Sequence, residues 1–249
     1  MLDASHRDLP VVLLIDDDMV SREVTATLLT LSGYTVHTAD GGFAALTMVA
    51  AGICHPGLIL MDAQMPGLSG LDLIRELRAS CQHAPIYVVS ASEPAPELIA
   101  AADGLLLKPF DNDALRKLLD GTPQLTRSFL DESDPVMSTE TLAQLRQLMP
   151  EQAVREIYTA VAADLIRRID ALSTAISRRD GDEIRRIGHA IKGGCGMAGA
   201  MQVARLGALL ESAPSSSEDN HLDNSRALLR DLRAAAQALQ RMLDADLPA

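Results

Sequence analysis

The sequence predicts an α/β domain followed by an all-α domain, because the spacing of its apolar residues changes partway along the chain. From residue 9 to residue 120, short apolar runs alternate with amphipathic segments, whereas no strand pattern recurs after residue 137. Strands that are apolar throughout are typical of a parallel sheet covered by helices on both faces. With 249 residues, the chain is long enough for two domains of ordinary size.

Five apolar runs predict the strands of the first domain, a (βα)5 unit. The strands are expected at VVLLID, YTVHTA, GLILMD, PIYVVS and GLLLKP, and the helices at residues 19–32, 41–51, 70–80, 94–102 and 111–120. Gly33, Gly52 and Gly121 come just after predicted helix ends, where a left-handed residue is favoured. Asp111 is a good N-cap for the last helix. We therefore assign residues 1–120 to the first domain.

The second half of the sequence predicts a helical bundle after a linker. Residues 121–137 contain two prolines and show no sustained period, which favours a linker. Helices are then expected near residues 138–149, 151–179, 181–195, 200–213 and 222–244. We assign residues 138–249 to this second domain.

Charge and composition exclude several classes of function. The formal net charge is -12, and an acidic surface would be repelled by nucleic acid and by anionic membranes. No apolar run is long enough to span a membrane and the N-terminus lacks a signal-peptide pattern, so we expect a cytoplasmic protein. The three cysteines form no CxxC pair, which argues against a zinc site. The first 120 residues carry 7 basic and 16 acidic residues, so this half is the more acidic one.

Charged and polar residues gather where the predicted strands end. Asp16, Asp17 and Asp18 follow the first strand, Asp62 ends the third, Ser90 ends the fourth and Lys108 follows the fifth. In a parallel sheet of order 2-1-3-4-5, ligands bind at the carboxyl edge between strands one and three. Two carboxylates about 4 Å apart repel by roughly 4 kcal/mol, so this cluster needs a cation or a proton. Oxygen ligands of this kind suit Mg²⁺.

These residues carry a family resemblance. LLIDDD, LILMDAQMPGLSG, VVSAS and LLLKPF resemble the response regulator receiver domain, a flavodoxin-like fold, over essentially all of residues 9–120. The resemblance implies that Asp62 accepts a phosphoryl group and that Asp16, Asp17 and Asp62 hold Mg²⁺. It also implies that Ser90 bonds one phosphoryl oxygen and that Lys108 neutralises another.

Two departures from the receiver pattern concern the surface that usually signals phosphorylation. Receivers usually carry an aromatic residue three positions before the lysine, and this chain has Leu105 there. The segment from Ser90 to Lys108 is also shorter than usual, which predicts a stunted fourth helix near Pro94 and Pro96. We expect phosphorylation to be intact and signalling output to be altered.

The second domain contains a helix that is unusually rich in glycine. Residues 188–200 read GHAIKGGCGMAGA, and each interior glycine costs roughly 1 kcal/mol relative to alanine. On a helical projection, His189 lies roughly 165° from the apolar stripe around Ile187, so we expect the imidazole to face outward. Arg185 and Lys192 would flank it, while Gly193 and Gly196 would leave room for an approaching protein. We therefore expect a partner protein to dock on four residues around His189, which are Arg185, Lys192, Gly193 and Gly196.

This stretch resembles a second family. HAIKGGCGMAG, followed by Leu206 and Glu211, resembles the HxxKGxxxxxG motif of the histidine phosphotransfer (HPt) domain. The resemblance implies that His189 receives and donates phosphoryl groups, that Lys192 helps to hold the phosphate, and that Gly193 prevents a clash with a docking receiver. A neutral imidazole is nucleophilic near its pKa of about 6.5. The Arg-rich region 178–186 also complements the acidic first half, which favours docking between the two domains.

The two resemblances together predict a bacterial two-component phosphorelay protein, a phosphoryl carrier rather than a classical enzyme. No ATP-binding kinase pattern is visible, so the expected partners are a sensor histidine kinase and other receiver or HPt proteins. GCGMAG at residues 194–199 also fits a dinucleotide fingerprint, but no strand surrounds it. A haloacid dehalogenase-like phosphatase, using Asp16 and Asp18, and a scaffold whose two domains serve unrelated partners are the alternatives.

Overall fold

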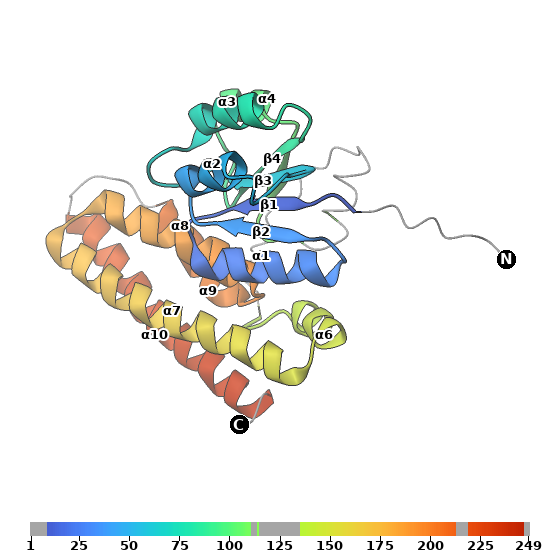
Figure 1. Ribbon diagram of the computed structural model, residues 1–249. Coiled ribbons are helices and arrows are strands. Elements are labelled where there is room, and N and C mark those ends of the chain that lie inside the picture. The colour runs from blue at the N-terminus through green and yellow to red at the C-terminus, as the bar shows by residue number, and fades with distance from the viewer. Residues whose placement is uncertain (1–8, 111–113, 115–134, 213–218, 247–249) are drawn as a thin grey trace. The chain divides into compact units, whose positions relative to one another are not determined.

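The computed structural model describes residues 9–110, 114, 135–212 and 219–246, and the chain divides into two compact units, residues 1–126 and 127–249 (Figure 1). The helix predicted at residues 111–120, its N-cap Asp111, and Gly121 lie outside the residues described in detail, as does most of the predicted linker. The domain limits at residues 120 and 138 therefore stay predictions. In the part of the chain that is described, no helix is both long and apolar enough to cross a membrane.

A five-stranded parallel sheet forms the centre of the first unit. Its strands are β1 (Val12–Ile15), β2 (Val36–Ala39), β3 (Leu58–Asp62), β4 (Ile86–Ser90) and β5 (Gly104–Leu107). They lie in the order β2-β1-β3-β4-β5, which confirms the predicted fold. Every residue of β1 and β3 is buried, as expected for strands covered on both faces.

Helices cover both faces of this sheet. They are α1 (Met19–Leu31), α2 (Gly42–Ala50), α3 (Gly70–Ser80) and α4 (Pro96–Ala101). Helix α1 lies on one face, and α2, α3 and α4 lie on the other (Figure 1). Gly33 and Gly52 follow α1 and α2 with φ of 93° and 69°, the left-handed conformation that their positions predicted. The prediction of a stunted fourth helix is confirmed, since α4 has 6 residues.

The second unit is a bundle of helices. Its elements are α6 (Thr139–Leu148), α7 (Glu151–Arg178), α8 (Gly181–Met197), α9 (Met201–Glu211) and α10 (Asp219–Asp246), and they match the predicted ranges. Helix α7 packs against α8 and α10, and α9 packs against the same two helices, so the four form a closed ring. The glycine-rich stretch is helical as far as Met197.

The short helix α6 and the long helix α7 are both tied to the turn between α8 and α9. Gly199 has φ of 77°, and a Cβ at this position would lie 2.8 Å from Thr141 Cβ on α6. The backbone amide of Ser138 donates a 2.8 Å hydrogen bond to the carbonyl of Gly199. Buried Tyr158 on α7 donates its hydroxyl to the carbonyl of Ala198 at 2.9 Å. These contacts hold the C-terminal end of α8, and so the helix that carries His189, in a fixed position.

Candidate functional site

The turn between β1 and α1 holds Asp16 from several sides. This carboxylate is only 2% exposed. Its Oδ1 accepts a 2.9 Å hydrogen bond from the backbone amide of Asp18, and its Oδ2 accepts a 2.7 Å hydrogen bond from the hydroxyl of Ser21. Asp18 is the N-cap of α1 and accepts from the amide of Ser21, while Arg22 donates to the carbonyl of Asp16. The start of α1 therefore fixes the position of Asp16.

Lys108 brings Asp16 and Asp62 together at the carboxyl edge of the sheet. Strands β1 and β3 are neighbours, so the residues at their ends lie side by side. The Nζ atom of Lys108 lies 2.8 Å from Oδ2 of Asp16 and 2.5 Å from Oδ2 of Asp62. All three side chains are at least 95% buried. The other oxygen of Asp62, Oδ1, accepts a 2.8 Å hydrogen bond from the amide of Gln64.

The charges of this edge do not balance. Burial alone would lower the pKa of Lys108, but the charges of Asp62 and Asp16 raise it above its usual value, so the ammonium stays charged. Burial raises the pKa of Asp17, and the negative charges of Asp62 and Asp16 raise it further. Among the residues described, the carboxylates of Asp16, Asp17 and Asp62 therefore outnumber the nearby cations, which are Lys108 and Arg22. An additional cation would relieve this excess of negative charge.

Oxygen donors and excess negative charge fit a hard divalent cation such as Mg²⁺. Across the described ranges, however, no three His, Cys, Asp or Glu side chains are already arranged around a common point as metal ligands. Lys108 bridges Asp16 and Asp62, and Asp17 takes part through its charge rather than through that hydrogen-bond network. The ligand set of Asp16, Asp17 and Asp62 thus stays a prediction.

Two further residues that the sequence singled out, Ser90 and Leu105, lie on the neighbouring strands β4 and β5. Ser90, at the end of β4, is fully buried, and its hydroxyl accepts a 3.3 Å hydrogen bond from the amide of Ser92. Its carbonyl accepts from the amide of Lys108 at 2.7 Å, which joins the ends of β4 and β5. Leu105 packs into the core and is 9% exposed. The phosphoryl-binding role of Ser90 and the effect of Leu105 on output stay predictions.

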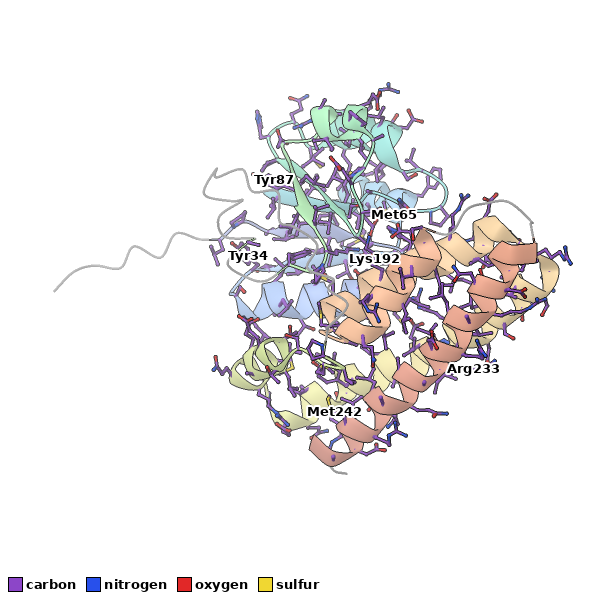
Figure 2. All side chains as sticks on the ribbon, turned by 180° about the vertical axis from the view of Figure 1, so that it is seen from behind. Tyr34, Met65, Tyr87, Lys192, Arg233 and Met242 are labelled. Carbon is purple, nitrogen blue, oxygen red and sulfur yellow. The ribbon has the colours of Figure 1, made fainter. Side chains whose placement is uncertain are left out.

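In the second unit, one glutamate contacts both His189 and Lys192. The Nδ1 atom of His189 lies 2.7 Å from Oε1 of Glu211, and Lys192 Nζ donates a 3.0 Å hydrogen bond to Oε2. Figure 2 labels Lys192 on α8, while Glu211 is the last residue of α9. Burial alone would raise the pKa of Glu211, but His189 and Lys192 lower it to about 2. An ionised carboxylate only accepts hydrogen bonds, so Nδ1 of His189 carries the proton. In a neutral imidazole, the lone pair is then on Nε2.

A close crossing of α8 and α9 produces this contact. A Cβ added to Gly188 would lie 2.6 Å from the amide nitrogen of Glu211 and 2.8 Å from the carbonyl oxygen of Gly207. A Cβ added to Gly207 would lie 2.7 Å from the amide nitrogen of Lys192. Distances below 3.0 Å are not tolerated by real Cβ atoms, so both positions need glycine. Part of the glycine content of α8 is therefore explained by helix packing and not by access for a partner.

The imidazole that the helical projection expects to face outward is only partly exposed. The side chain of His189 is 13% exposed and that of Lys192 is 11% exposed. The two flanking cations also have acidic partners, because Arg185 forms an ion pair with Asp182 and Lys192 with Glu211. A projection of α8 alone cannot show this, since Glu211 comes from α9. Gly193 and Gly196 are buried in α8, and their part in docking stays a prediction.

Comparisons with known proteins agree with both halves of the chain. Residues 12–120 match the family model of the response regulator receiver domain, and residues 124–245 match that of the Hpt domain. Among curated proteins, the chain is similar to response regulator MprA of Mycobacterium avium, with 35% identity over 54% of this chain and 58% of the relative. It is also similar to MprA of Mycobacterium tuberculosis, with 33% identity over 59% and 62%. The chain thus spans less than two thirds of these relatives.

The chain is also similar to solved structures. Chemotaxis protein CheY4 of Vibrio cholerae is 30% identical over 46% of this chain and 98% of its own, with a TM-score of 0.41. Response regulator TrrA of Thermotoga maritima, solved in complex with Mg²⁺ and BeF, is 28% identical over 46% and 99%, with a TM-score of 0.42.

Proposed function

We propose which residues accept phosphoryl groups in this chain. The chain belongs to the response regulator receiver and Hpt domain families and is a two-component phosphorelay protein. In this proposal, Asp62 accepts a phosphoryl group in the receiver and His189 carries one in the Hpt domain. The observation that supports it best is that each unit places a buried lysine beside the proposed acceptor. Lys108 contacts Asp62 directly, and Lys192 shares Glu211 with His189.

At the receiver site, an oxygen of the Asp62 carboxylate attacks the phosphorus of a donor. A new P–O bond forms while the donor's P–N or P–O bond breaks, and the donor leaves with that electron pair. Lys108 is positioned to neutralise the charge of the incoming phosphoryl oxygens, and Ser90 to hydrogen-bond one of them. A magnesium ion held by Asp16, Asp17 and Asp62 would offset further charge on these oxygens.

At the Hpt site, Nε2 of His189 attacks the phosphorus of an aspartyl phosphate, and the P–O bond to the aspartyl carboxylate breaks. The proton stays on Nδ1, so Nε2 has no proton to lose. The imidazole gains positive charge during this step, and Glu211 lies 2.7 Å from Nδ1 to balance it. The resemblance to the Hpt motif included Glu211 but gave it no role, and the contact that the packing of α9 on α8 creates supports this one.

The proposed partners are sensor histidine kinases and other receiver or Hpt proteins in the cytoplasm. Receiver and Hpt domains are phosphotransfer modules, and the chain would carry phosphoryl groups without using ATP itself. Exchange between Asp62 and His189 within one chain is a separate part of the proposal, which an experiment can isolate.

The test is labelling with radioactive acetyl phosphate and Mg²⁺ in wild type, Asp62→Asn and His189→Gln. We expect a label that depends on Asp62. An acid-labile, base-stable label that requires both residues would support transfer from Asp62 to His189. A hydroxylamine-sensitive label that is unchanged in His189→Gln would mean that the two domains serve different partners. An unlabelled wild type would contradict the receiver proposal, and turnover of phosphomonoesters would favour a phosphatase.

A further inference from the structure

The hydroxyl of Ser21 is fully buried, and among the described residues its hydrogen-bond partner is Asp16, a carboxylate that the receiver resemblance assigns to a metal site. A serine inside a helix commonly bonds a backbone carbonyl one turn back. Ser21 instead reaches Oδ2 of Asp16 at 2.7 Å. Its amide donates to the N-cap Asp18, so both hydrogen-bond donors of Ser21 are used to shape the same turn.

The hydrogen bonds of Asp16 are distributed unevenly over its two oxygens. Oδ2 accepts from Ser21 and from Lys108, whereas Oδ1 accepts only from the amide of Asp18 among the described residues. Each carboxylate oxygen has about two lone-pair sites, so Oδ2 is saturated and Oδ1 has one site left. The uneven distribution therefore leaves a single acceptor site, on Oδ1.

We propose that Ser21 is a positioning residue for cation binding, which orients Asp16 so that Oδ1 is the oxygen available to Mg²⁺. Without the hydroxyl, Oδ2 regains a free acceptor site and the carboxylate loses one of the bonds that set its rotation. The proposal rests on the proposed function, because the cation is the one that the receiver site is expected to bind. It adds a residue outside the predicted ligand set of Asp16, Asp17 and Asp62.

The same helix supplies a matched control. Thr25 lies one turn after Ser21 and is 1% exposed, but its hydroxyl has no hydrogen-bond partner in the described structure. Ser21→Ala and Thr25→Val each remove one buried hydroxyl from α1. Only the first removes a hydrogen bond to Asp16. A general effect of altering the buried face of α1 should appear in both variants, whereas an effect on cation binding should appear in Ser21→Ala alone.

The test is a Mg²⁺ titration of the full chain without any phosphoryl donor, followed through the backbone amide of Asp18 by ¹H–¹⁵N NMR. This amide shares Oδ1 with the proposed cation, so its resonance should move as Mg²⁺ binds. Loss of a group that orients a metal ligand typically weakens binding by about 10- to 100-fold, and we expect an effect at the lower end for Ser21→Ala. Thr25→Val should bind like wild type, and Ser21→Thr, which keeps the hydroxyl, should recover affinity.

The outcomes separate this inference from the function on which it rests. If wild type binds Mg²⁺ and Ser21→Ala binds it equally well, the role of Ser21 is refuted while the proposed function stands. A wild type that binds no Mg²⁺ would overturn both. Equal losses in Ser21→Ala and Thr25→Val would also overturn the inference, because they would report a disturbed helix. Circular dichroism of each variant before titration checks that the fold is intact.

Discussion

The glycine pair between α8 and α9 gives a prediction that opposes ordinary helix propensity. Gly188 lies inside a long helix, where alanine is normally better by about 1 kcal/mol. The added methyl of Gly188→Ala would approach the amide nitrogen of Glu211 to 2.6 Å and the carbonyl oxygen of Gly207 to 2.8 Å. Both are backbone atoms, which cannot rotate away as a side chain could. The two helices must therefore move apart.

The expected magnitude follows from these two opposing effects. Overpacking a tight contact typically costs about 1–3 kcal/mol, and two backbone overlaps favour the upper part of that range. After the gain in helix propensity, we expect Gly188→Ala to lower the free energy of unfolding of the Hpt domain by about 1–2 kcal/mol. In a domain of this size, that change corresponds to a Tm lower by about 4–8 °C.

Thermal unfolding followed by circular dichroism measures the Tm, and ¹⁵N NMR measures the Nδ1 resonance of the His189 imidazole. Separation of the helices should lengthen the 2.7 Å contact between His189 and Glu211, so the Nδ1 resonance should shift and phosphoryl transfer to His189 should slow. Gly41→Ala is the control, since a Cβ there would meet nothing within 4 Å. An increase in Tm for Gly188→Ala, with an unchanged imidazole spectrum, would refute the close crossing.

Four further predictions concern the side chains of Glu211, Lys108 and Tyr158. Glu211→Gln should slow phosphoryl transfer to His189 by about tenfold or more, because it removes a charge-assisted hydrogen bond; stopped-flow transfer from a phosphorylated receiver measures it. The pKa of Glu211 is lowered from 4.5 to about 2. The ionised carboxylate therefore stabilises the folded Hpt domain fully above pH 4.5, and this stabilisation is lost as the pH falls toward 2. The Tm difference between wild type and Glu211→Gln should shrink over that range. Lys108→Met should destabilise the receiver by about 3 kcal/mol or more in urea at pH 7, because two buried carboxylates lose their shared cation, and Mg²⁺ should restore part of the loss. Tyr158→Phe should cost about 1 kcal/mol in urea unfolding, because the carbonyl of Ala198 loses its donor; equal stability would show that this hydrogen bond has no net effect.

Local sequence patterns were sufficient to predict the strands and helices that the structure describes. The apolar runs that predict strands correspond to β1–β5, and the helical ranges of the second half correspond to α6–α10. The carboxyl-edge residues could also be grouped from the sequence, because strand order in a parallel sheet determines which strand ends are neighbours. The sequence thus predicts that Asp16, Asp62 and Lys108 lie together, and in the structure Lys108 donates a hydrogen bond to each of the two carboxylates.

Contacts between helices could not be predicted in the same way. The projection of α8 gave the direction of His189 relative to its own apolar stripe but carried no information on α9. Glu211 and Gly207 are far from His189 in sequence, and only their packing shows that the imidazole has an acidic partner. Ser21 was missed for a related reason, since a serine two residues into a helix gives no sequence signal that its hydroxyl faces a carboxylate.

The crossing at Gly188 and Gly207 limits how this protein can change in evolution. At most buried contacts, a larger residue on one side can be accommodated by a smaller one opposite. Here both members of the pair are already glycine, so no smaller residue exists to compensate, and any replacement at either position adds volume. Variation at one position therefore cannot be rescued at the other, and must instead shift the backbone that brings His189 and Glu211 together.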